Sequence, residues 1–201
     1  MVWYELASRY TRDIKLLSGL WPQIQSCYSS PGRFYHNCSH LDYMMKKAIR
    51  HKSRLTDPDI VMFSIFYHDL VYDPLRNDNE EKSAIKVGED LIKLGVTGNK
   101  IVTCQNQIMA TKDHHSRVDE DTNYLIDFDL AILGECPELY LEYSKNIRKE
   151  YAIYNDLLYK TGRKKVIGNF LERESLFTTG WFYENYELRA RENLENELEN
   201  L

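Results

Sequence analysis

The hydrophobic positions of this chain recur at helical spacing almost throughout, and alternating strand patterns are almost absent. The segment Tyr4–Leu20 shows the spacing first, with apolar side chains at Leu6, Tyr10, Ile14 and Leu17. These positions share one face of a helix, so a helix is expected from Tyr4 to about Leu20.

Turn and capping residues divide the next part of the chain. SPGR at 30–33 predicts a turn, and a helix is expected from Ser39 to about His51. TDPD at 56–59 is typical of a helix start with Pro58 in the first turn. The helix that follows is expected to turn four side chains inward: Ile60, Phe63, Phe66 and Tyr67.

The clearest amphipathic pattern runs from Asn79 to Leu94, and Gly95 stands where a C-terminal glycine cap belongs. Its apolar side consists of Ala84, Val87, Leu91 and Leu94. Four more helices are expected at Lys100–Ala110, Glu138–Tyr159, Lys164–Glu172 and Trp181–Leu201. The pattern as a whole predicts an all-α, multi-helix bundle.

Length and composition fit one globular domain. The chain has 201 residues, of which 43% are hydrophobic and 28% charged. We expect a single domain over 1–201, with a core at about 30–135 and C-terminal helices at 138–201 packing on it. The charged last helix is compatible with a homodimer.

Charge and cysteine content narrow the environment. A net charge of -5 gives no indication of nucleic-acid binding, and no apolar stretch reaches the length of a membrane span. The first dozen residues carry charges and lack the apolar core of a signal peptide, so a cytoplasmic protein without a membrane partner is expected. The four cysteines form no CxxC pair, which predicts free thiols in a reducing compartment.

Histidines and aspartates recur in apolar or aromatic company. Such pairs occur in RFYHNCSHLDYM (His36, His40), FYHDLVYD (His68, Asp69), MATKDHH (His114, His115) and LIDFDLAIL (Asp127, Asp129). A buried carboxylate is costly unless it is paired or bound to a metal, and LIDFDLAIL contains no lysine or arginine. One residue alone could cap a helix, but together they indicate a divalent cation such as Mn, Fe, Co, Ni, Zn or Mg.

The order His, then His-Asp, then Asp resembles the HD superfamily of metal-dependent phosphohydrolases, which is all-α. The resemblance is closer to its branch of predicted HD-type phosphohydrolases and covers nearly the whole chain. The matching motifs are RxYHNxxH from Arg33, the HD motif within Tyr67–Asp73, NExxSA from Asn79, IxATxxH from Ile108, DxDLAxLG from Asp127, IRxEY from Ile147 and ARxNL from Ala190.

The resemblance implies one divalent metal ion held by His40, His68, Asp69 and one aspartate of IDFDL. Asp129 is the preferred fourth ligand, because HD proteins usually place the last aspartate just before a leucine-containing helical turn. Asp127 is the alternative ligand or an outer partner of the site.

The chemistry of this ligand set leads us to expect catalytic roles for Asp69 and Glu80. Asp69 would bind the metal and orient a water whose pKa the cation lowers. Glu80 opens a helix, where the helix dipole suits a carboxylate, and is the expected general acid or base. Substrate-binding roles fall to Arg33, His36, Asn79 and His114, and the neighbouring His115 could face the site instead.

His36 permits two interpretations. HNCSH places it four residues before His40, which on a helix would put both imidazoles on one face, as in a zinc site. We favour the other, in which Pro31-Gly32 keeps His36 in the loop that approaches the site.

The function that these motifs imply is a metal-dependent phosphohydrolase of a small phosphorylated substrate, with a nucleotide as the plausible choice. The alternative is a non-catalytic module that binds a metal and a nucleotide. Turnover of a phosphorylated substrate distinguishes the two.

Overall fold

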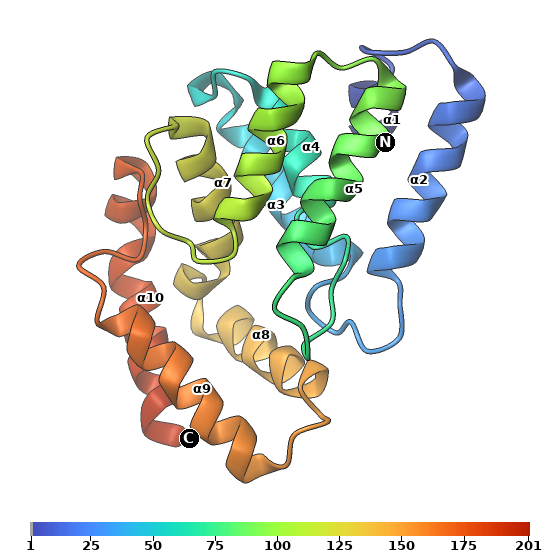
Figure 1. The fold of residues 1–201 in the computed structure, drawn as a ribbon. Helices are drawn as coiled ribbons and strands as arrows, with labels where there is room; N and C mark the ends of the chain where they lie inside the picture. Colours follow the sequence, from blue (N-terminus) through green and yellow to red (C-terminus); the bar gives the residue numbers. More distant parts are fainter. Residues whose placement is uncertain (1) are drawn as a thin grey trace. The chain divides into compact units, whose positions relative to one another are not determined.

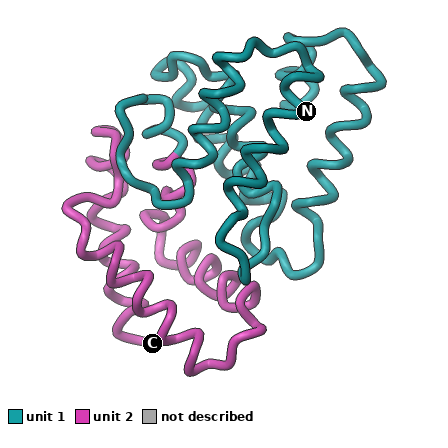
Figure 2. The backbone as a smooth tube through the Cα atoms, in the orientation of Figure 1, with its two compact units in different colours: residues 1–125 teal, residues 126–201 magenta. Residues whose placement is uncertain are grey.

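The computed structural model describes residues 2–201, and over this range the chain folds into α-helices and two short 3-10 helices without strands (Figure 1). The all-α prediction is therefore confirmed. The chain divides into two compact units, 1–125 and 126–201, and the division falls inside α7 (Glu120–Leu130) (Figure 2). The expected single domain, with its core ending near 135, stays a prediction.

The first unit is built around a buried helix. Its elements are α1 (Val2–Ala7), α2 (Ile14–Tyr28), α3 (Cys38–Arg50), the 3-10 helix η1 (Lys52–Arg54), α4 (Pro58–Tyr67), α5 (Asn79–Leu94), α6 (Gly98–Ala110) and the first part of α7. Every residue of α4 from Ile60 to Tyr67 is buried. Because α4 is apolar on all sides, it packs against α3, α5 and α6 together.

The expected single helix over Tyr4–Leu20 was wrong. The chain forms α1 and then starts α2 afresh, because the carboxylate of Asp13 accepts a hydrogen bond from the Leu16 N–H at 3.0 Å. The cap turns Ile14 outward, where it is 78% exposed. The apolar spacing is continuous and predicts one helix, but the Asp13 cap starts a second helix within it.

The caps expected for the next helices are confirmed. The Asp57 carboxylate caps α4 with Pro58 in its first turn, and α5 ends at Gly95 in the left-handed region with φ +81°. The four side chains expected on the inward face of α5 are buried: Ala84, Val87, Leu91 and Leu94. These helices carry their boundaries in their own sequence.

The second unit contains the end of α7, the 3-10 helix η2 (Ala131–Gly134), α8 (Pro137–Glu150), α9 (Asp156–Leu171) and α10 (Gly180–Asn200). The expected helices Glu138–Tyr159 and Lys164–Glu172 were wrong at their shared boundary. The chain leaves the helix after Glu150, and Asn155 caps α9 by accepting from the Leu158 N–H. α9 then continues without interruption to Leu171.

A buried ion pair joins α9 to α10. The Arg163 guanidinium donates to both carboxylate oxygens of Glu197, at 2.8 and 2.9 Å, and the Tyr140 hydroxyl of α8 donates to the same carboxylate. Beside this cluster lies an open pocket of about 700 Å³, lined by α8, α9 and the end of α10. None of the expected site residues lines this pocket.

A helix that crosses a membrane needs about 20 consecutive, mostly apolar residues. Among residues 2–201, no helix combines the necessary length with sufficient apolar character.

Candidate metal centre

His40 enters the core of the first unit from the first turn of α3. Asn37 caps this helix, since its side-chain oxygen accepts from the Ser39 N–H at 2.8 Å. The cap fixes the start of α3 and leaves His40 on its inner side, where only 3% of the residue is exposed. Local capping therefore delivers an imidazole into an apolar environment.

His68 reaches the same place from the end of α4. It follows the buried run that ends at Tyr67 and is 1% exposed. Its Nδ1 lies 2.9 Å from the carbonyl oxygen of Ile65, and a carbonyl only accepts, so Nδ1 carries the proton. In the neutral ring Nε2 is then an acceptor, which is the arrangement that a carbonyl bonded to the other ring nitrogen imposes on metal-binding histidines.

Three electron-pair donors converge at this point. The Nε2 atoms of His40 and His68 lie 3.2 Å apart, and Oδ2 of Asp69 lies 3.0 Å from His68 Nε2. All three donor atoms lie within 4.8 Å of one another, two from buried residues and one from a half-buried residue. The Asp69 side chain is 15% exposed, so the group is open to solvent on its carboxylate side.

The donor set fits a divalent metal ion. Two ligands that lie at right angles, each about 2.1 Å from one ion, are about 3 Å apart. The separations of His68 Nε2 from His40 Nε2 and from the Asp69 carboxylate, 3.2 and 3.0 Å, match that value. Two lone-pair atoms at 3.0 Å repel unless a proton or a cation lies between them, and imidazole with carboxylate suits the borderline divalent metals. The residues of the first unit thus supply three of the four expected ligands.

His36 stands at the open side of this group. It lies in the loop just before the Asn37 cap rather than on α3, which confirms the interpretation that placed it in an approach loop. Its Nε2 is 4.0 Å from the Asp69 carboxylate, and its ring packs on Tyr72 with centroids 4.4 Å apart. With 20% of its side chain exposed, His36 adjoins Asp69 from the solvent side.

Arg33 contacts the backbone on both sides of this group. Its guanidinium donates to the backbone carbonyls of His36 (3.1 Å), Asp69 (2.7 Å) and Leu70 (3.0 Å). These bonds give Arg33 a positioning task at the backbone of the site. Its expected contact with substrate stays a prediction.

The residues of the NExxSA motif fasten the segment after the His-Asp pair to α5. The Asn79 amide both accepts from the Asp73 N–H and donates to the Asp73 carbonyl, and the Ser83 hydroxyl accepts from the Val71 N–H. Asn79, expected to bind substrate, therefore closes the loop before α5. Glu80 lies beside it in the first turn of α5 and is half-buried, and its catalytic role stays a prediction.

The two aspartates of IDFDL have different surroundings. Asp127 is fully buried, and its carboxylate accepts four hydrogen bonds, from the N–H and hydroxyl groups of Thr178 and Thr179. Burial raises the pKa of Asp127 to about 6, although these hydrogen bonds lower it. These four bonds occupy the Asp127 carboxylate and fix the start of α10.

Asp129 itself lies in the last turn of α7, one residue before Leu130, within the second unit. Its side chain is half-buried. The assignment of Asp129 as the fourth ligand stays a prediction.

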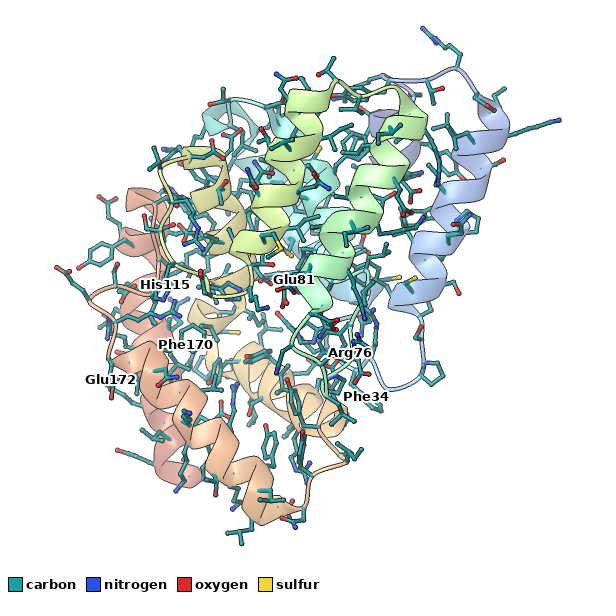
Figure 3. All side chains as sticks on the ribbon, in the orientation of Figure 1. Phe34, Arg76, Glu81, His115, Phe170 and Glu172 are labelled. Atoms are coloured by element: carbon teal, nitrogen blue, oxygen red, sulfur yellow. The ribbon has the colours of Figure 1, made fainter. Side chains whose placement is uncertain are left out.

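The histidine pair after α6 also differs in exposure. His114 is half-buried and has a left-handed backbone with φ +52°, which is uncommon for a residue other than glycine. His115 is exposed, and its N–H donates to the Asp113 carboxylate (Figure 3). The difference favours His114 as the member of the pair for an enclosed site.

Sequence reasoning missed the part that Tyr28 plays. This tyrosine is fully buried, and its hydroxyl accepts the backbone N–H of Asp69 at 3.2 Å. Burial, and then the charge of Asp69, raise the pKa of Tyr28 well above its usual range, so the phenol stays neutral. No motif marks a tyrosine 41 residues before its partner, so only the fold could identify it.

Comparisons with protein-family models, with curated proteins and with solved structures found no match.

Proposed function

We propose that this protein is a metal-dependent phosphohydrolase that acts on a small phosphorylated substrate, with a nucleotide as the plausible choice. The observation that carries the proposal is the convergence of His40, His68 and Asp69, whose donor atoms all lie within 4.8 Å of one another. The order of motifs along the chain supports it.

A divalent ion held by these residues would supply an acidified water and offset negative charge on a phosphoryl oxygen. The chain's own residues would divide the remaining work. His40 and His68 would act as neutral ligands, and the Ile65 carbonyl holds His68 in the tautomer that this role needs. Asp69 would both bind the ion and orient the attacking water through its partly exposed carboxylate.

Hydrolysis joins the water oxygen to phosphorus, breaks the bond from phosphorus to the leaving oxygen and delivers a proton to that oxygen. Two groups of the first unit are suited to the proton transfer. Glu80 lies in the first turn of α5, and His36 stands 4.0 Å from the Asp69 carboxylate at the open side. An imidazole can both give and accept a proton, which suits either direction of transfer.

The first test is elemental analysis of metal in the wild type and in the double variant His68→Ala, Asp69→Ala, both purified without chelator. We expect about one divalent ion per chain in the wild type. The double variant should contain none. The matched control is His115→Ala, which removes an exposed imidazole from the same unit and should leave the metal content unchanged.

The second test is turnover of phosphorylated compounds with the metal that the first test identifies. Release of phosphate or pyrophosphate that is lost in Asp69→Ala supports the hydrolase. Tight nucleotide binding without product over hours would instead favour the non-catalytic binding module. Wild-type protein without metal, even after addition of Mn, Ni or Mg, would overturn the proposal.

A further inference from the structure

Arg33 occupies an unusual position for a charged side chain beside a cation site. A guanidinium near a phosphate is expected to point at the ligand, yet its hydrogen bonds run to three backbone carbonyl oxygens. Two of these carbonyls, those of Asp69 and Leu70, belong to the turn after α4, and the third, that of His36, belongs to the loop before α3. One side chain therefore ties together two segments 36 residues apart.

Two aromatic rings hold the guanidinium in place. The centroid of the Tyr28 ring lies 4.9 Å from Arg33 Cζ, and that of Tyr72 lies 5.3 Å away. Tyr28 also accepts the Asp69 N–H through its hydroxyl, and Tyr72 packs on the His36 ring. The same two tyrosines thus contact Arg33 and a residue of the candidate site.

The contacts act on the backbone of Asp69 from two sides. Arg33 binds its carbonyl oxygen at 2.7 Å and Tyr28 binds its N–H at 3.2 Å. A residue whose N–H and C=O are both held has little freedom to rotate its peptide planes, so the direction of its side chain is restricted. The carboxylate of Asp69 is the least buried donor of the group and would otherwise be the most mobile.

We infer that Arg33 is a positioning residue that fixes the turn of Asp69, and the loop of His36, in the arrangement that binds the metal. The inference rests on the proposed metal site and adds a residue to it. Outer partners that orient metal ligands typically contribute a factor of about 10 to 100 in metal affinity. Arg33 is expected to act in this range through backbone carbonyls.

The test measures the dissociation constant for Co²⁺ alone, by titration of the metal-free protein and its visible absorption bands. In Arg33→Met, which keeps the side-chain volume and removes all five N–H donors, we expect the constant to rise about tenfold or more. Arg33→Lys keeps the charge, but its ammonium nitrogen cannot bridge carbonyls in two loops as a guanidinium does, so an intermediate constant is expected. The Co²⁺ bands should change shape in both variants as Asp69 shifts.

Arg76→Ala is the matched control. Arg76, labelled in Figure 3, lies in the same unit, is exposed and pairs with Asp78. Its loss removes the same charge without touching the hydrogen bonds of Arg33. Its Co²⁺ constant should stay within about twofold of the wild type. Circular dichroism and thermal unfolding of the metal-free proteins report whether each variant folds.

A folded Arg33→Met protein whose Co²⁺ constant and bands match the wild type would overturn the inference, because a merely structural role lowers only the unfolding temperature. If Arg33→Met does not fold, Arg33→Lys decides by the same criterion. A wild type that binds Co²⁺ more tightly than Arg33→Met but turns over no phosphorylated compound would overturn the proposed hydrolase activity. The same result would support the positioning role of Arg33. A wild type that binds no Co²⁺ would overturn both.

Discussion

The Nε2 atoms of His40 and His68 lie 3.2 Å apart, although 28 positions separate the two residues in the chain. The first comes from the start of one helix and the second from the end of another, and both are almost fully buried. Two imidazoles and an adjoining carboxylate gain little from such closeness in an apolar core unless a cation binds them. This relationship sets the first expectation for experiment.

Replacing His36 and His40 in separate variants should distinguish metal binding from catalysis. His40→Ala removes a buried ligand, so bound metal should be lost and activity with it. His36→Ala leaves the three converging donors intact, so metal content should stay at the wild-type level while kcat/KM falls about tenfold, or ~1.4 kcal/mol. Metal analysis together with steady-state kinetics checks both results. Loss of metal in His36→Ala would show that His36 is itself a ligand.

Substitution of Asp127 and of Asp129 by asparagine should affect different properties of the protein. Asp127→Asn puts an NH2 group against donors of Thr178 or Thr179, so we expect the free energy of unfolding to fall by about 3 kcal/mol. Asp129→Asn removes the charge of the preferred fourth ligand and should weaken metal binding. Denaturant unfolding and metal titration of both variants test this pair. Normal stability in Asp127→Asn would contradict the structural role of its four hydrogen bonds.

The pair Arg163–Glu197 should stabilise the second unit strongly. Glu197→Gln leaves the buried guanidinium without its charged partner, which typically costs about 3 to 5 kcal/mol of unfolding free energy. The control is Asp156→Asn, which breaks the pair with Arg148. Because the Asp156 side chain is 80% exposed, this change should have little effect on stability. Denaturant unfolding of both variants measures the difference, and equal effects would contradict the assignment.

The same pair predicts a dependence of stability on pH. Burial alone would raise the pKa of Glu197, but the hydrogen bond and charge of Arg163 outweigh it and lower the pKa below 4.5. The stabilisation is therefore present above pH 4.5 and is lost as the pH falls through the lowered value. Glu197→Gln should flatten the stability curve in that acidic range. An unchanged slope would show that other carboxylates govern acid unfolding.

Gly134 should tolerate no added methyl group. A Cβ at this position would lie 2.7 Å from the Tyr186 carbonyl oxygen, so Gly134→Ala should lower the unfolding free energy by about 1 to 3 kcal/mol. The control is Gly162→Ala in the interior of α9, where nothing lies within 4 Å and alanine should stabilise by about 0.5 to 1 kcal/mol. Thermal unfolding checks both signs, and two stabilised variants would contradict the close packing at Gly134.

The sequence by itself determined the helical class and those helices whose boundaries rest on local contacts. Asp57 with Pro58 and the cap at Gly95 act within one turn, so their effect can be read from neighbouring letters. It also singled out His40, His68 and Asp69 by residue type and order. The breaks before α2 and α9 rest on caps just as local, but the apolar spacing masked them.

The tertiary structure alone decided how the candidate site is assembled. Which carbonyls of the turn after α4 Arg33 binds, and why the Asp127 carboxylate is occupied, depend on partners far away in the chain. Such contacts form only when helices pack, because their strength comes from burial and from the exclusion of water, which no short stretch of sequence encodes. Residue type can therefore indicate a candidate ligand, but the packing of the helices determines which atoms its donor groups contact.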